Sequence, residues 1–137
     1  MKTRNVVLLV LLSVALILLI TGAVVAELVV PRLGHARMAA LEAAAVHEIR
    51  NIETAQVQYF SLYGKYAATL AELGPPAAEE KNGYVFTMST TPGGFAIHAN
   101  PKVYNSTGRR TFYSDESMQI HQNWNPEPAN ATSPDLK

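Results

Sequence analysis

A long apolar run occupies residues 6–26. It carries no charge, and only Ser13, Thr21 and Gly22 interrupt a series of Val, Leu, Ile and Ala. As a helix rising 1.5 Å per residue, the run is about 31 Å long, which matches the hydrocarbon core of a bilayer. The pattern predicts a transmembrane segment over residues 6–30, preceded by a short basic N-terminus over residues 1–5 that we expect in the cytoplasm.

The same run is open to a second interpretation, a secretory signal peptide. Its apolar core over residues 6–20 lies at the upper length of such signals, and Val24-Val25-Ala26 supplies the small residues of a cleavage site after Ala26. We favour the uncleaved anchor, because signal cores are usually shorter. Either interpretation places residues 32–137 on the far side of the membrane.

A second helical pattern follows without an intervening loop. Over residues 32–63, apolar residues recur at steps of three, four or seven and form one stripe of an amphipathic helix. We expect Pro31 to kink this helix and Gly64 to end it. The residues off the stripe, expected on the solvated face, are Arg37, His47, Glu48, Arg50 and Gln58.

Alternating apolar and polar residues further along predict a small antiparallel sheet. Residues 84–89 and 95–100 read as two strands joined by the turn Thr91-Pro92-Gly93-Gly94. A second pair of strands is expected over residues 110–114 and 118–121. Before the sheet, Leu70 to Leu73 suggest one turn of helix, and residues 77–82 read as a polar loop.

These elements predict an α+β fold in which the amphipathic helix packs on a β-meander over residues 83–121. The predicted head spans residues 31–121, and the Pro- and Asn-rich residues 122–137 are predicted to form a flexible tail. The residues expected in the helix-to-sheet core are Met38, Leu41, Ala45, Ile49, Ile52, Tyr59, Phe86, Phe95, Ile97, Phe112 and Ile120.

Composition excludes several classes of function. Lys and Arg number 11 and balance 11 Asp and Glu, without a basic block, which argues against a nucleic-acid partner. The absence of cysteine removes disulfides, thiolate zinc sites and cysteine nucleophiles. The serines lack a nucleophile elbow, and no glycine-rich phosphate loop is present. We therefore expect no enzyme activity, no catalytic residues and no cofactor.

Asp115 and Glu116 are the candidates for a metal site. A hard divalent cation requires about six or more oxygen ligands, and the flanking serines add few. A polar hairpin turn is therefore the favoured interpretation of this pair.

The four histidines do not form a predicted metal site either. His35 and His47 are too far apart for the i, i+3 or i, i+4 spacing of a helical metal pair. His98 and His121 lie on predicted strands and are possible neighbours, but both occupy outward positions. We expect all four on the solvated surface.

Two groups of stretches carry a resemblance to a known family. The first group is Val30-Pro31-Arg32-Leu33, residues 36–43, residues 49–56 and Tyr59; the second is residues 63–66, 70–74, 83–86 and 107–115. The first group looks like the long first helix of type IV pilins and type II secretion pseudopilins, and the second is similar to their globular heads. The resemblance covers about residues 6–121. It implies an anchored helix whose second half packs on an antiparallel sheet.

The resemblance also implies a function and a location. We expect a non-catalytic structural subunit or accessory of a type IV pilus or type II secretion system, in the bacterial inner membrane with its head in the periplasm or on an extracellular filament. Its partners would be the lipid bilayer and other pilin-like subunits, contacted through the N-terminal helix. Small residues that permit close helix packing are Ala15, Gly22, Ala23 and Ala26.

The chain departs from the family at two places. The family has a Gly-Phe or Gly-Met prepilin peptidase site and, shortly after it, a Glu within the apolar segment. Counted back from Pro31, these fall on Leu9-Val10 and Val14, so neither motif is present. Because a carboxylate in hydrocarbon is costly unless it is paired, Val14 removes both that cost and a docking contact. The departure favours an alternative function, a stand-alone membrane-anchored or secreted binding module with a pilin-like head.

We expect the mature chain to begin at or near Met1 and to resist extraction from membranes by alkaline carbonate, because the apolar run is long enough to span a bilayer and the peptidase site is missing. N-terminal sequencing of the membrane fraction tests this expectation. A soluble chain beginning at Glu27 would establish the signal-peptide interpretation, and a methylated terminus at Val10 would overturn our interpretation of the departure.

Overall fold

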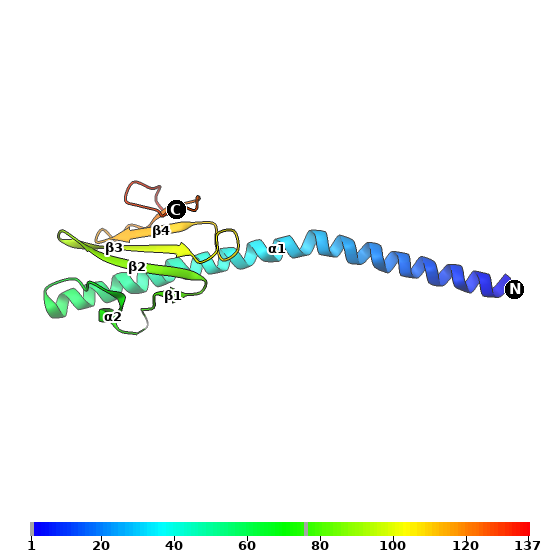
Figure 1. The fold of residues 1–137 in the computed structure, drawn as a ribbon, viewed down its shortest axis with the longest axis horizontal. Coiled ribbons are helices and arrows are strands. Elements are labelled where there is room, and N and C mark those ends of the chain that lie inside the picture. The colour runs from blue at the N-terminus through cyan, green and yellow to red at the C-terminus, as the bar shows by residue number, and fades with distance from the viewer. Residues whose placement is uncertain (1, 76) are drawn as a thin grey trace. The chain divides into compact units, whose positions relative to one another are not determined.

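A single long helix, α1 (Lys2–Tyr63), begins the fold (Figure 1). The computed structural model describes residues 2–75 and 77–137, with the backbone alone for Lys2 and residues 28–31. The chain forms two compact units, Met1–Ala36 and Arg37–Lys137, and α1 contributes residues to both. The kink expected at Pro31 falls outside the residues whose side chains are described.

In the first unit, the described side chains of α1 are exposed over residues 3–27 and 32–36. Their apolar surface includes Leu8, Leu12 and Leu19, which are 60%, 60% and 72% exposed. This helix is long and apolar enough to cross a membrane, and a signal sequence close to an N-terminus has the same properties. The anchor and signal-peptide interpretations both remain compatible with it.

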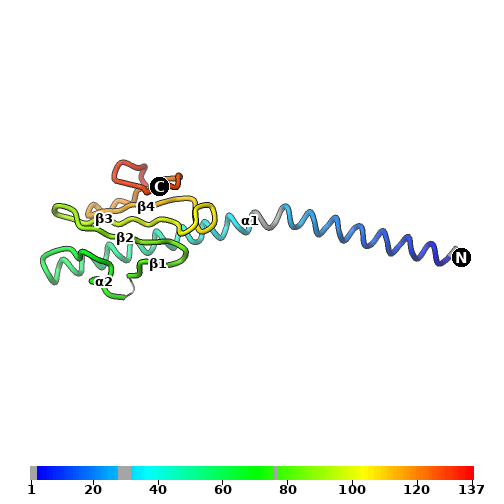
Figure 2. Tube along the Cα trace, in the orientation of Figure 1, coloured from blue at the N-terminus to red at the C-terminus, as the bar shows by residue number. Residues whose placement is uncertain are grey.

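The second unit contains a five-stranded antiparallel sheet in which each strand pairs with the next along the chain. The strands are β1 (Glu80–Lys81), β2 (Tyr84–Thr91), β3 (Gly94–Pro101), β4 (Thr111–Asp115) and β5 (His121–Asn123). Figure 2 follows this meander from β1 in green to β4 in orange. The prediction of an α+β fold, with an apolar N-terminal helix and an antiparallel meander, is confirmed.

The central hairpin follows the predicted alternation. β2 and β3 pair from Tyr84↔Pro101 to Thr91↔Gly94, so that only Pro92 and Gly93 form the turn. Gly93 has φ of 90°, a left-handed conformation that glycine adopts without steric cost. The strands are therefore slightly longer than the sequence alone indicates.

β1 replaces part of the polar loop expected over residues 77–82. Lys81 pairs with Tyr84 across Asn82 and Gly83, whose φ angles are 53° and 75°. Asn-Gly with two positive φ angles is the preferred composition of a type I′ hairpin turn, whose twist matches that of the strands. The turn brings a short, charged strand to the edge of the sheet, where charge discourages edge-to-edge pairing.

The last strand begins later than predicted. Met118 adopts φ of 61° and its amide donates to the carbonyl of Asp115, so the chain turns there instead of extending. β5 is therefore His121–Asn123 and not residues 118–121, while Ile120 enters the core beside it.

The core lies between α1 and the sheet. Within the expected set, Leu41 is partly buried against the core, whereas Met38 and Tyr59 are half-buried and outside the buried cluster. Tyr84, Leu70 and Ala99 also belong to the cluster. The buried members of the expected set are Ala45, Ile49, Ile52, Phe86, Phe95, Ile97, Phe112 and Ile120.

Residues 122–137 do not form the flexible tail that their composition predicts. Ala129 is fully buried, and its amide donates to Thr111 Oγ1 at 3.0 Å. The Leu136 amide donates to the carbonyl of Ile120, and the Leu136 side chain packs against the core. These two anchors order a segment whose polar residues alone would not fold.

We expect Ile52→Ala to lower the free energy of unfolding by about 2–5 kcal/mol, because it leaves a cavity in the core beneath the sheet. His47→Ala, on the exposed side of the same helix, is the matched control and should change stability by less than about 0.5 kcal/mol. Denaturant unfolding of the chain in detergent measures both. A larger loss for His47→Ala than for Ile52→Ala would show that the wrong face of α1 had been assigned to the core.

Candidate functional site

The face of α1 that meets the sheet carries carboxylates as well as aliphatic side chains. Glu42, Glu48 and Glu53 are only 4%, 2% and 4% exposed. A buried carboxylate is costly unless it is paired and hydrogen-bonded. Each of the three has such a partner, and each partner sits at a different place in the second unit.

Glu42 binds the chain just before β4. Its Oε2 accepts from Arg110 Nε at 2.8 Å, and its Oε1 accepts from the Arg109 amide at 2.7 Å. The Arg110 guanidinium also stacks against the rings of Phe112 and Trp124, 5.4 and 5.0 Å from their centroids. These contacts hold the arginine in the one geometry that neutralises Glu42.

Tyr84 lies next to this pair. The ring is fully buried, and its hydroxyl donates to the carbonyl of Arg110 at 2.8 Å. Burial, and then the charge of Glu42, raise the pKa of Tyr84 far above its usual range, although Arg110 opposes the shift. The phenol therefore stays protonated as a structural hydrogen-bond donor.

Glu48 corrects a prediction. The helical pattern placed it on the solvated face, but it is buried and accepts from Lys81 Nζ at 2.7 Å and from Asn51 Nδ2 at 3.2 Å. The physical reason is β1: the Asn-Gly turn brings Lys81 over this part of the helix. Oε1 of Glu48 has no hydrogen-bond partner among the described residues.

Glu53 and Gln56 make further polar contacts of the helix. Glu53 accepts from Arg50 Nη1 at 2.9 Å and from Ser114 Oγ on β4. Gln56 exchanges two hydrogen bonds with the backbone of Ala67, at 3.0 and 2.9 Å. The two hydrogen bonds between Gln56 and Ala67 hold the segment that follows α1 against the helix.

A signal for the buried glutamates was present in the sequence. Glu42 precedes Ala45 by three positions and Glu53 follows Ile49 by four, so both share the helical spacing of the aliphatic stripe. A pattern that counts only apolar residues overlooks them. The identity of their partners depends on the sheet and is not readable from the helix.

Asp115 and Glu116 do not converge on a common point. Asp115 accepts from the Ser117 amide at 2.9 Å and from the Tyr113 hydroxyl at 3.2 Å, while the Glu116 carboxylate lies over Gly94. Burial acts to raise the pKa of Asp115, but hydrogen bonds from Ser117 and Tyr113 and the proximity of His121 outweigh it and lower the pKa. Burial of Tyr113, and to a smaller extent the charge of Asp115, raises the pKa of Tyr113. Over residues 2–75 and 77–137, no group of three or more His, Asp or Glu is placed to hold a metal ion.

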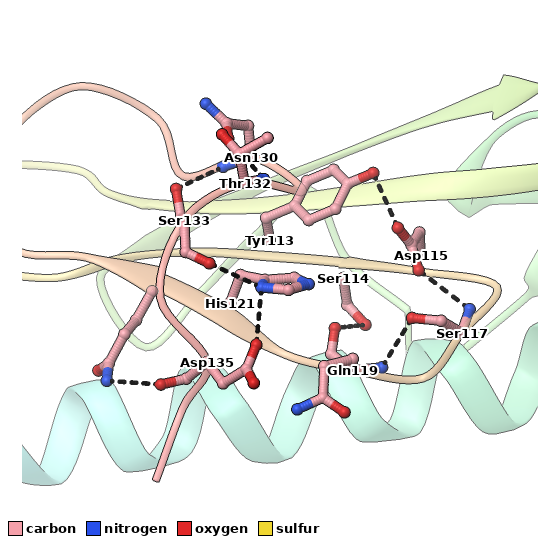
Figure 3. A network of polar contacts seen from close by, with 11 residues as sticks. Tyr113, Ser114, Asp115, Ser117, Gln119, His121, Asn130, Thr132, Ser133 and Asp135 are labelled. Atoms are coloured by element: carbon pink, nitrogen blue, oxygen red, sulfur yellow. Dashed lines mark hydrogen bonds and ion pairs between the residues drawn. The ribbon is translucent and has the colours of Figure 1, made fainter.

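Two of the histidines lie in one row on the sheet. His98 pairs with Tyr113 and Tyr113 pairs with His121 across β3, β4 and β5, with ring centroids 5.1 and 6.0 Å apart. His121 also contacts Ser133 and Asp135, as Figure 3 shows. His35 and His47 are exposed on α1. The row is a network of aromatic and hydrogen-bonding contacts.

The expected helix-packing face lies in the first unit. Ala15, Gly22, Ala23 and Ala26 are all exposed on α1, and a Cβ atom added at Gly22 would meet nothing within 4 Å. Since a helix turns about 100° per residue, Ala15, Gly22 and Ala26 lie along one side and Ala23 borders them. This side offers room for the close approach of a second helix.

Two of the open cavities in the second unit lie beside α1. One, of about 290 Å³, lies between α1 and the short helix α2 (Leu70–Leu73), lined by Glu48, Asn51, Gln58 and Leu73 among others. The other, of about 320 Å³, lies between Phe60 and Tyr66 and the β2–β3 turn. Neither cavity brings together an acid, a base and a nucleophile.

Comparison of the chain with models of protein families, with curated protein sequences and with solved structures found no match. The inference of function therefore rests on the residues and their arrangement.

We expect Arg110→Ala to destabilise the second unit by about 3 kcal/mol, because it leaves the Glu42 carboxylate buried without its charged partner. The matched control is Lys102→Ala, which breaks the exposed pair of Lys102 with Glu80 and should cost less than about 1 kcal/mol. Denaturant unfolding measures both variants.

Replacing Glu42 and Arg110 together by leucine should recover most of that loss, since no unpaired charge then remains buried. A double variant as unstable as Arg110→Ala would mean that stacking of Arg110 on its aromatic neighbours, and not charge pairing, is what the single substitution removes.

Proposed function

We propose that this chain is a non-catalytic, membrane-anchored structural subunit or accessory of a type IV pilus or type II secretion pseudopilus. The observation that carries the proposal is the difference between the two parts of α1. Its first part presents exposed apolar side chains, and its later part is the platform on which an antiparallel sheet packs. The resemblance over residues 31–59 supports the same assignment.

The exposed apolar surface of the first unit favours contact with lipid or with another protein. Side chains such as Leu9, Leu11 and Leu18 are 65%, 61% and 66% exposed. Exposure of a continuous apolar surface of this kind to water is unfavourable, whereas contact with lipid or with other helices is favourable. In lipid, packing between helices depends on small residues, and Gly22 with its neighbouring alanines supplies them.

The second unit supports a role in assembly for a different reason. Glu42, Glu48 and Glu53 are each engaged in holding the helix to the sheet. In the proposed role the unit is a rigid body that presents its outer surface to neighbouring subunits in the periplasm or on a filament. We place the chain in the bacterial inner membrane before assembly.

A second candidate function follows from the departure at Leu9-Val10 and Val14. A chain without the peptidase site and the membrane Glu fits a stand-alone binding module that stays anchored, or is secreted after cleavage following Ala26. This module would use the same head without entering a filament.

In-membrane crosslinking distinguishes the two functions. The chain has no cysteine, so single cysteines at positions 15, 22 and 26 report on one side of α1, and cysteines at positions 17 and 24 report on the opposite side. At native expression we expect a ladder of multimers from the first group and little product from the second. Gly22→Leu should reduce the ladder severalfold without changing the thermal unfolding of the second unit, because a large side chain blocks close approach.

Equal crosslinking from both sides would indicate random collision and contradict the proposal. If every position yields only monomer, the proposed structural subunit is contradicted and the stand-alone module is the function that remains. A soluble chain that begins at Glu27 would support its secreted form.

A further inference from the structure

Trp124, the one tryptophan in the sequence, is held in place by its neighbours and yet is 57% exposed. The Arg110 guanidinium stacks on the indole, 5.0 Å from the ring centroid. The Tyr104 hydroxyl donates to the Trp124 carbonyl at 2.7 Å, and Val103, next to Tyr104, is 54% exposed. A large aromatic side chain that is fixed in position but exposed to water is suited to anchor a protein interface.

The cavity of about 320 Å³ between α1 and the β2–β3 turn has aromatic walls. The Tyr66 ring lies 4.7 Å from the Phe60 ring and 5.0 Å from the Phe95 ring, measured between centroids. Phe60 is 45% exposed, and the exposed residues Thr90 and Gly93 also line the cavity. The cavity therefore offers an apolar, open site that is wide enough to admit one aromatic side chain.

Trp124 and this cavity lie at opposite ends of the sheet. The pair Thr111↔Asn123 places Trp124 just beyond the start of β4, and the start of β4 lies beside the end of the antiparallel strand β3. The cavity lies at the other end of β3, where the turn joins Thr91 to Gly94 (Figure 1). β3 is eight residues long, so its two ends are about 23 Å apart. One copy of the chain therefore cannot place Trp124 in its own cavity.

The charges at the two ends are complementary. Lys65 lines the cavity, and the Glu116 carboxylate lies over Gly94, which lines it too. At the other end, Arg109 adjoins the arginine that stacks on the indole, and Glu127 follows Trp124 by three residues. These four charged side chains are exposed, and none forms an ion pair with another described residue. Two copies placed end to end can pair Lys65 with Glu127 and Glu116 with Arg109.

We propose that the cavity receives the Trp124 side chain of a second copy of this chain. The contact joins two different surfaces, so each added copy still offers one cavity and one tryptophan, and the second units extend into an open row. One anchor and two exposed ion pairs make a weak contact between two copies. It becomes effective when other contacts hold many copies close together. This end-to-end contact goes beyond the helix packing proposed for the first unit and uses none of its residues.

Fluorescence of Trp124 in the full chain, held in an excess of detergent, tests the contact without a label. We expect the emission to shift to shorter wavelength, and quenching by acrylamide to fall severalfold, as the chain is concentrated from low micromolar to near millimolar. The reason is that docking transfers the indole from water into an apolar cavity. Emission that does not change with the concentration of the chain would overturn the proposal, whether the indole is then in water or in the micelle.

Two matched variants on β2 identify the surface that covers the indole. Thr90→Phe fills the mouth of the cavity and should abolish the shift, whereas Thr87→Phe alters another exposed threonine of β2 outside the cavity and should preserve it. Lys65→Glu should weaken the shift, and adding Glu127→Lys should restore it. A shift that persists in Thr90→Phe would overturn the proposal.

The end-to-end contact and the helix packing have separate readouts. Cysteine crosslinking at positions 15, 22 and 26 reports on the first unit, and Trp124 emission reports on the second. Failure of one contact is therefore observed independently of the other.

Discussion

Pairing of the buried carboxylates on α1 is the constraint on which the arrangement of the second unit depends. Glu42, Glu48 and Glu53 face Arg110, Lys81 and Ser114. Lys81 lies on β1, whereas Arg110 immediately precedes β4 and Ser114 lies within it. Buried pairs of this kind add little net stability, because desolvation offsets their attraction, but leaving one charge unpaired costs several kcal/mol. A helix shifted by one turn would break all three contacts together. The aliphatic stripe drives the helix onto the sheet, and the carboxylates determine where along the sheet it stops.

Residues at the periphery of the second unit also help to fix the register of the helix on the sheet. Arg110 is positioned for Glu42 by its stacking on Phe112 and Trp124, so Trp124, just after β5, contributes indirectly to the helix contact. The segment that begins with Trp124 continues to Ala129 and Leu136, which anchor it to the sheet and core. An edge strand of three residues is thereby covered. In the proposed assembly, such a unit would meet its neighbours as a defined surface.

The parts of the fold that the sequence predicts are those governed by local periodicity. Alternation identifies the β2–β3 hairpin, and the apolar spacing identifies Ala45, Ile49 and Ile52 as a buried stripe. Glu48 was wrongly placed because its burial depends on Lys81, which is distant in sequence and arrives through the two-residue strand β1. Residues 122–137 were wrongly predicted to be a flexible tail, because the prediction followed their polar composition and overlooked the two apolar anchors, Ala129 and Leu136. For the candidate helix-packing face, the spacing of Ala15, Gly22 and Ala26 is readable from the chain, whereas a contact between two chains cannot be read from one sequence.

The central claim is that the later part of α1 and the sheet form one cooperative unit, in which the aliphatic stripe drives packing and the buried carboxylates fix its register. Native-state hydrogen exchange under increasing denaturant tests it most directly, with the chain held in detergent. The account predicts that the amides of residues 45–56 in α1 and those of the central strand β3 open together, with the same free energy and the same denaturant dependence. Exchange of the helix amides at markedly lower denaturant than those of β3 would show that the helix detaches while the sheet persists, and would contradict the account.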